Sequence, residues 1–194
     1  QKRLPKPENA PEKLDLVLPT LAVKQLQQLT TDELLFAYDE SSAVFTSENV
    51  TLTTRLLEGN YPDVDRLLGG HYGRQTVMDT KELHDTVKRA QIILSNGEKG
   101  HASLHTNGIA TITAKLPDGV ANLSETLTTF TETLDDEEAQ TFDIAFNPSF
   151  MAKLLTTLKT DLVNIDFMGP VRPMRITPQE DDSLIHLLTP IRQN

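Results

Sequence analysis

The chain has 194 residues, of which 38% are hydrophobic and 24% are charged, and this composition is typical of a folded globular protein with one or two domains. It contains no cysteine, which excludes a disulfide framework and cysteine-based zinc sites. The sequence has no run of roughly 18 apolar residues and no signal peptide, so we expect a cytoplasmic protein. The net charge of −10 argues against a uniformly basic surface for binding nucleic acid. It does not exclude a protein whose basic side chains are gathered on one face, apart from the acidic ones.

One order of elements occurs three times along the chain: a short strand, a helix and several further strands. The first copy is predicted as a strand at 14–18, a helix at 20–29 and strands at 33–39, 43–47 and 50–57. The second is predicted as a strand at 75–78, a helix capped by Asp79 or Thr80 that stops at Asn96-Gly97, and strands at 110–114 and 123–134. The third is predicted as a strand at 142–146, a helix that starts at Asn147-Pro148, and strands at 162–167, 173–176 and 184–191.

This order predicts an α+β fold with antiparallel sheets backed by helices, and it fits neither a parallel Rossmann sheet nor a helical bundle. A single copy cannot bury both its sheet face and its helix stripe, so the second and third copies are expected to form one domain. We therefore expect two parts, 1–69 and 70–194, joined by a glycine-rich linker at 69–73. The first part is then half a domain, whose partner is expected upstream of Gln1.

Sequence motifs of catalysis and metal binding are absent. The five histidines are not spaced as metal ligands are in known motifs. No serine lies in a G-x-S-x-G motif, and no serine or threonine stands with a general base in a known catalytic motif. The sequence predicts no enzyme, no cofactor and no metal site. A small hydrolase is the weakest of the alternatives.

Three segments of the chain resemble bacterial sliding clamps. They are TRLLEGNYPD at 54–63, FNPSF at 146–150 followed by Leu154, Leu155 and Leu158, and LLTPIR at 187–192. The resemblance implies a DNA clamp fold, with this chain covering the second half of the middle domain and all of the third. It also implies a processivity factor that encircles double-stranded DNA as a head-to-tail homodimer without catalysing a reaction.

In the sliding clamp family, partner proteins insert a short peptide with apolar side chains into a groove between the middle and third domains. The partners implied are the DNA polymerase III alpha subunit, the clamp loader and other proteins with a clamp-binding motif. The matching groove positions are Pro62, Arg66, Leu67, Asn147, Phe150, Val171, Pro173, Leu187, Leu188, Thr189, Pro190, Ile191 and Arg192. Pro173 stands where the family pattern has a small polar residue. Leu188 can be either a residue of a core strand or a residue of the groove, and the sequence leaves both alternatives open.

The resemblance also implies roles for basic and apolar residues on the helices. Lys24, Lys88, Arg89, Lys153 and Lys159 are expected to face DNA phosphates, and the alternative is that they form ordinary solvated helix faces. Ile93 and Leu94 are expected near the dimer interface, although the helix stripe makes Leu94 a core candidate. A monomeric peptide-binding adaptor on the same fold is the second candidate function.

Overall fold

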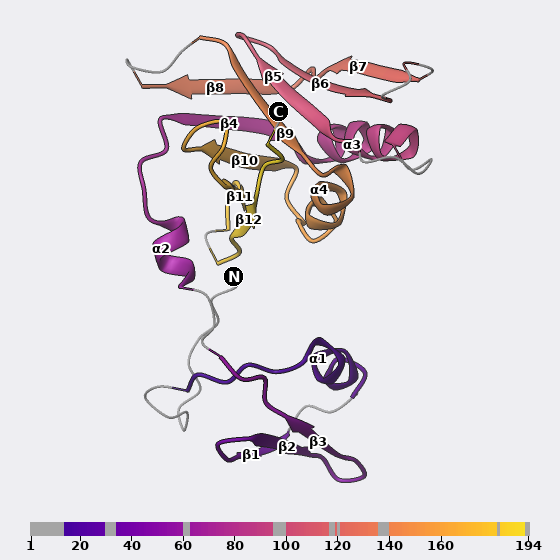
Figure 1. Cartoon of the computed structure of the whole chain (residues 1–194), viewed down its shortest axis with the longest axis vertical. Coiled ribbons are helices and arrows are strands. Elements are labelled where there is room, and N and C mark those ends of the chain that lie inside the picture. The colour runs from indigo at the N-terminus through magenta and orange to yellow at the C-terminus, as the bar shows by residue number, and fades with distance from the viewer. Residues whose placement is uncertain are drawn as a thin grey trace. The chain divides into compact units, whose positions relative to one another are not determined.

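The computed structural model describes residues 14–29, 34–59, 63–94, 100–116, 119, 121–135, 140–181 and 183–192 (Figure 1). These residues fall into two compact units that divide between Asp63 and Val64. The division lies a few residues before the boundary expected at 69/70. The glycine-rich segment 69–73 therefore belongs to the larger unit and does not separate the two.

The smaller unit contains one helix and an antiparallel sheet of strand order β1-β2-β3. Its elements are α1 (Thr20–Leu26), β1 (Leu35–Tyr38), β2 (Ser42–Thr46) and β3 (Thr51–Arg55). Asp39 closes the first turn, because its carboxylate accepts hydrogen bonds from the backbone amides of Ser41 and Ser42, each at 2.7 Å. Aspartate stabilises tight turns in this way.

Two sequence predictions for the smaller unit are wrong in detail. The segment 14–18 forms no strand, and one backbone hydrogen bond, from the amide of Leu57 to the carbonyl of Val17 at 2.8 Å, connects it to the end of the sheet. A strand needs successive bonds to a neighbour. The predicted helix at 20–29 ends at Leu26, because the last turn tightens into i to i+3 bonds such as that from Leu29 to Leu26 at 3.1 Å.

The larger unit consists of helices α2 to α4 and strands β4 to β12. Its first half contains α2 (Val64–Leu68), β4 (Arg74–Asp79), α3 (Thr80–Leu94), β5 (Ala102–Thr106), β6 (Ala110–Lys115), β7 (Asn122–Thr126) and β8 (Phe130–Leu134). Its second half contains β9 (Phe142–Phe146), α4 (Pro148–Leu155), β10 (Leu162–Phe167), β11 (Met174–Pro178) and β12 (His186–Leu188). The strands form a five-stranded sheet of order β12-β11-β10-β4-β8 and a four-stranded sheet of order β7-β6-β5-β9.

The two halves of the larger unit exchange their first strands. β4 precedes α3 in the first half and pairs on one edge with β8 of that half, but on the other edge it pairs with β10 of the second half, where Met78 lies opposite Val163. β9 precedes α4 in the second half but pairs with β5 of the first, where Ile144 lies opposite Leu104. All of these pairs are antiparallel, as the sequence predicts. Neither half completes a sheet without the other.

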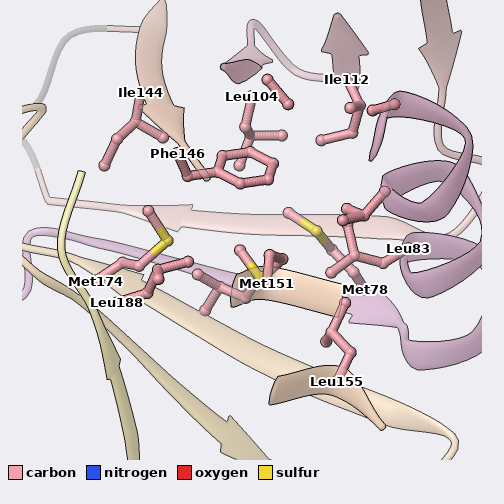
Figure 2. Packing of buried hydrophobic residues seen from close by; sticks show 14 of the residues in the cluster. Met78, Leu83, Leu104, Ile112, Ile144, Phe146, Met151, Leu155, Met174 and Leu188 are labelled. Atoms are coloured by element: carbon pink, nitrogen blue, oxygen red, sulfur yellow. The ribbon is translucent and has the colours of Figure 1, made fainter. Parts of the chain in front are cut away.

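One apolar core is shared by both sheets and by α3 and α4 (Figure 2). α3 contributes the residues that helical spacing predicts: Leu83, Val87, Ala90 and Leu94. α4 contributes Met151 and Leu155, while Leu154 is only partly buried. Removing a large apolar side chain from such a core costs about 2–5 kcal/mol.

The two longer helices of this unit begin at polar side chains that the sequence identifies. Asp79 accepts the backbone amide of Glu82 at 2.7 Å, and Asn147 accepts the backbone amide of Ser149 at 2.9 Å. Both side chains satisfy amides in the first helical turn that have no partner within the helix. The predicted stop of α3 at Asn96-Gly97 lies outside the described residues.

Several elements of the larger unit differ from the prediction. α2 was not predicted, and the single strand predicted at 123–134 is two strands, β7 and β8, which belong to different sheets. The last strand is shorter than 184–191 and covers His186–Leu188. None of the helices in the described part of the chain is long and apolar enough to cross a membrane.

Candidate functional site

The first element of the candidate peptide site is the start of α4. Asn147 caps this helix through its side-chain oxygen, which accepts the amides of Ser149 and Phe150. The cap directs the first turn so that Phe150 is 60% exposed, although it follows two apolar strand residues that are buried, Ala145 and Phe146. An exposed phenylalanine on a rigid, capped turn is suited to contact an apolar partner side chain.

The C-terminal tail lies beside the start of α4. β12 pairs with β11, with Leu188 opposite Met174, and the tail continues until the amide of Ile191 donates to the carbonyl of Ala145 at 2.8 Å. Ala145 is two residues before Asn147, so the tail reaches the end of β9 next to the helix cap. Pro190 and Ile191 are half-buried there, and Thr189 and Arg192 are exposed.

Leu188 is part of the core. Its side chain is 6% exposed and belongs to the same buried cluster as Met151 and Met174 (Figure 2). The structure therefore favours the core alternative for this residue. Leu187, its neighbour on the opposite face of the strand, is half-buried and lies opposite Arg175.

The turn between β10 and β11 contributes a second exposed apolar side chain, because Val171 is 62% exposed. The turn is closed by a hydrogen bond from the amide of Arg172 to the carbonyl of Gly169 at 3.4 Å. Pro173, which is half-buried, directly precedes Met174 and so begins the strand that pairs with the tail. α2 carries the last two candidates in the described residues, Arg66 and Leu67, and both are exposed. Pro62 lies outside the described residues.

The structure thus brings the tail close to the start of α4 and to the start of β11. A hollow of about 450 Å³ elsewhere, on the outer face of the five-stranded sheet, is lined mainly by polar side chains, among them Asn164, Asp166 and Arg175. Its polar lining does not suit apolar peptide anchors. The exposed apolar side chains at Phe150 and Val171 remain the better candidates for that role.

The candidate DNA-facing residues of this unit lie on or directly after α3 and α4, which pack against each other. Lys88, Lys153 and Lys159 are exposed, and none forms an ion pair with the described residues. Lys24 is exposed on α1 of the smaller unit. Flexible, unpaired lysines on a helical surface suit loose contacts with phosphates that carry no sequence information.

Arg89 differs from these lysines because it is already paired. Its Nε donates to Oε1 of Glu125 on β7 at 2.7 Å, and its Nη2 donates to Thr86 at 3.1 Å. The hydrogen bonds from Arg89 lower the pKa of Glu125 below its ordinary value. Arg89 therefore ties α3 to β7, a role that sequence spacing does not reveal.

Lys81 was missed in the sequence analysis. It lies seven residues, about two helical turns, before Lys88 and so shares its face of α3. Lys81, His84 and Lys159 line a hollow of about 400 Å³ between the start of α3 and the end of α4. Lys81 pairs with Asp85 at 2.7 Å, an exposed pair that contributes little to stability. The seven-residue spacing of Lys81 and Lys88 could have indicated that both lie on the same face of the helix.

The apolar end of α3 is exposed at a different residue from the two expected at the dimer interface. Leu94 is buried in the core, and Ile93 is partly buried and packs against it. Ile92 is 69% exposed and is the large apolar side chain that α3 presents to solvent. Of the three neighbouring residues, Ile92 is the most exposed.

Comparisons with known proteins agree with this architecture. Residues 66–192 match the family model of the DNA polymerase III beta subunit, C-terminal domain. The chain is 30% identical to the beta sliding clamp of Streptococcus pneumoniae, with 100% of this chain and 51% of that protein covered. It is 29% identical to the beta sliding clamp of Staphylococcus aureus, with 95% and 48% covered.

A solved structure extends the agreement to the fold. The beta subunit from DNA polymerase of Streptococcus pyogenes superimposes with a TM-score of 0.84 at 30% identity, and the match covers 98% of this chain and 51% of that one. The chain spans about half the length of the relatives it matches. From the family match over residues 66–192 and this structural likeness, we conclude that the chain belongs to the bacterial sliding clamp family and represents part of a DNA polymerase III beta subunit.

Proposed function

We propose that this chain is part of a processivity factor that encircles double-stranded DNA in the cytoplasm and tethers replication proteins to it. The observation that carries the proposal is the family match over residues 66–192, together with unpaired lysines on the two packed helices α3 and α4. A ring holds DNA by enclosing it and needs only weak phosphate contacts. In this role the chain binds and positions other proteins and catalyses no reaction itself.

The domain assignment is part of the proposal. Residues 70–194 correspond to the third clamp domain, and residues 1–69 to the second half of the middle domain. In support, the smaller unit has the order of the second half of the larger one: an extended segment, a helix and a three-stranded meander. The first strand of the meander in the larger unit, β10, pairs with β4 of the other half. The corresponding strand of the smaller unit, β1, has no strand partner on its outer edge among the described residues. The exposed Leu35 and Phe36 on that strand support a covering half-domain in the full-length subunit.

The proposed partner site consists of the exposed side chains around the tail and the start of α4. Phe150, Val171 and Ile191 supply apolar surface, and Arg66 and Arg192 form a polar rim. A peptide with a glutamine followed by leucine and phenylalanine buries its apolar side chains here. The partners of this class are the DNA polymerase III alpha subunit and the clamp loader. The end of α3, with exposed Ile92 and partly buried Ile93, contributes to the contact that closes a homodimeric ring.

Topological retention tests the clamp function. The full-length subunit, loaded on closed circular DNA, is expected to remain bound at high salt and to be released when the circle is linearised, because a ring slides off a free end. A linear fragment of the same sequence, blocked at both ends by bound protein, is the control and should retain the ring. A full-length protein that stays monomeric and binds only the peptide would instead support the adaptor function.

A further inference from the structure

α2 is a short helix with little to hold it in place by itself. It has five residues, and none of them is buried. Isolated helices of this length do not form stably in water, because nucleation is costly. The residues that follow α2 are therefore expected to contribute to its position in the larger unit.

A contact chain connects the end of α2 to the five-stranded sheet. Tyr72 is buried, and its hydroxyl donates to the carbonyl of Leu68, the last residue of α2, at 2.9 Å. This bond satisfies a carbonyl that has no partner within the helix. The guanidinium carbon of Arg175 lies 4.0 Å from the centre of the Tyr72 ring, a cation–π arrangement.

Arg175 is itself held by a buried carboxylate. Arg175 and Asp166 lie opposite each other on β11 and β10, and Nε and Nη2 of the arginine donate to Oδ2 of the aspartate at 2.9 and 2.7 Å. Two bonds to one carboxylate set the plane of the guanidinium and thus its stacking on Tyr72. Burial raises the pKa of the Tyr72 hydroxyl, so it stays protonated and able to donate.

Gly70 adds a second attachment, at the turn that carries Val171. Its φ is +145°, and a Cβ at this position would lie 2.5 Å from the sulfur of Met168. Glycine is favoured here because L side chains rarely adopt this φ, and a Cβ would also displace the Met168 side chain. The segment after α2 is thus fixed against the end of β10 as well as against Arg175.

We propose that Tyr72, Arg175 and Asp166 are positioning residues that hold α2 in place and so preorganise Arg66 and Leu67 for the partner peptide. The inference rests on the proposed peptide site. Arg175 is the second residue of β11, which directly follows the turn with Val171 and Pro173, and it lies opposite Leu187 of the tail. The same arginine therefore joins α2 to two other parts of that site. A preorganised helix lowers the ordering cost of binding and strengthens it without adding a contact to the peptide.

The test is titration of a fluorescent peptide containing glutamine, leucine and phenylalanine into wild-type protein and Tyr72→Phe. The substitution keeps the ring on Arg175 and removes only the bond to Leu68. We expect binding about three- to tenfold weaker, as for the loss of one hydrogen bond, with the melting temperature unchanged. Tyr38→Phe, at an exposed tyrosine of the smaller unit, is the matched control and should bind as the wild type does.

A double-mutant cycle separates positioning from a general loss of structure. If Tyr72 acts through α2, Tyr72→Phe weakens binding less in a Leu67→Ala background than in wild type, because only Arg66 is then left to be positioned. An equal loss in both backgrounds, or no loss in either, overturns the proposal. Backbone amide exchange in α2, where the amide of Gly69 donates to the carbonyl of Asp65 at 2.8 Å, is expected to be faster in Tyr72→Phe.

The exchange measurement also distinguishes failure of this inference from failure of the proposed function. If the peptide does not bind wild-type protein, the assignment of the peptide site is wrong. Faster exchange in α2 of Tyr72→Phe then still supports the positioning role of Tyr72. Unchanged exchange overturns it.

Discussion

Arg74 on β4 and Glu132 on β8 form an ion pair inside the larger unit, where their side chains are 1% and 7% exposed. Nη1 of Arg74 also donates to the hydroxyl of Thr106 at 3.0 Å, and that hydroxyl donates to Glu132 at 2.9 Å. The pair lies at the junction of β4 and β8 and connects both strands to β5 of the other sheet. Because both side chains are largely removed from water, each charge is stabilised mainly by the other one and by the hydrogen bonds around it.

Replacing Glu132 by alanine is therefore expected to destabilise the protein by about 3–5 kcal/mol, since Arg74 is left charged and buried without its partner. Urea unfolding followed by circular dichroism measures the loss. Thr133→Ala, at the exposed neighbour on β8, should stay within about 0.5 kcal/mol of wild type. The double variant Arg74→Met with Glu132→Leu should recover most of the stability. A loss below about 1 kcal/mol in Glu132→Ala would contradict this account.

Leu188 and Ile191 are expected to respond oppositely to truncation, although they are close in the same tail. Leu188→Ala removes a core side chain and should lower the free energy of unfolding by about 2–5 kcal/mol. Ile191→Ala should leave the melting curve nearly unchanged and weaken peptide binding by about tenfold, as for an apolar anchor worth ~1.4 kcal/mol. Calorimetric titration and melting of both variants check the pair. An Ile191→Ala protein that melts early yet binds normally would assign Ile191 to the core.

The basic residues of α3 and α4 should contribute unequally to DNA binding by the full-length subunit. Lys88→Ala, Lys153→Ala and Lys159→Ala are each expected to reduce the slope of log K against log salt by about 0.9, one released counterion for each phosphate contact. Arg89→Ala should change the slope less, because Glu125 already pairs with Arg89. Fluorescence anisotropy with duplex DNA over a salt series measures the slopes. Equal effects of Arg89→Ala and Lys88→Ala would show that DNA displaces Glu125.

Stability should fall on acidification because of His186 on β12. Burial lowers the pKa of His186 below its ordinary value of 6.5, so the folded state binds this proton less readily than the unfolded chain. The resulting stability is present above pH 6.5 and is lost as the pH falls below that value toward the folded-state pKa. Unfolding at a series of pH values, compared with His186→Gln, isolates this contribution. An identical pH dependence in both proteins would contradict it.

The sequence predicted the elements whose signals are local. The stripe of α3 and the caps at Asp79 and Asn147 depend on residues within a few positions of each other, and the structure agrees with them. The break between β7 and β8 is different. Both carboxylate oxygens of Glu82 accept hydrogen bonds at this turn, from the amides of Thr128 and Thr129 at 2.7 and 3.1 Å, and this contact between distant residues has no local sequence signal.

The sequence resemblance names the positions of the candidate site, but it does not show which of these side chains are exposed. The resemblance gave both Leu188 and Ile191 as groove positions and left a core role open for Leu188 alone, and the structure shows that Leu188 is buried and Ile191 half-buried. Sequence spacing likewise could not show that Arg89 pairs with Glu125, because the partner lies on another element. α2 has too few residues for a periodic pattern, so neither it nor its attachment through Tyr72 was predicted.

The exchange of first strands between the halves has a consequence for synthesis on the ribosome. β4 emerges early, but β10, which pairs with it from Asp79 opposite Leu162 to Arg74 opposite Phe167, is made only after the whole first half and α4. One edge of β4 can pair with β8 of the same half, but the other edge must wait for β10 while translation continues. Such long-range pairing slows folding and leaves an unpaired strand edge exposed. A nascent chain arrested before Leu162 should consequently stay sensitive to protease and bind chaperones, and one extended beyond β12 should not.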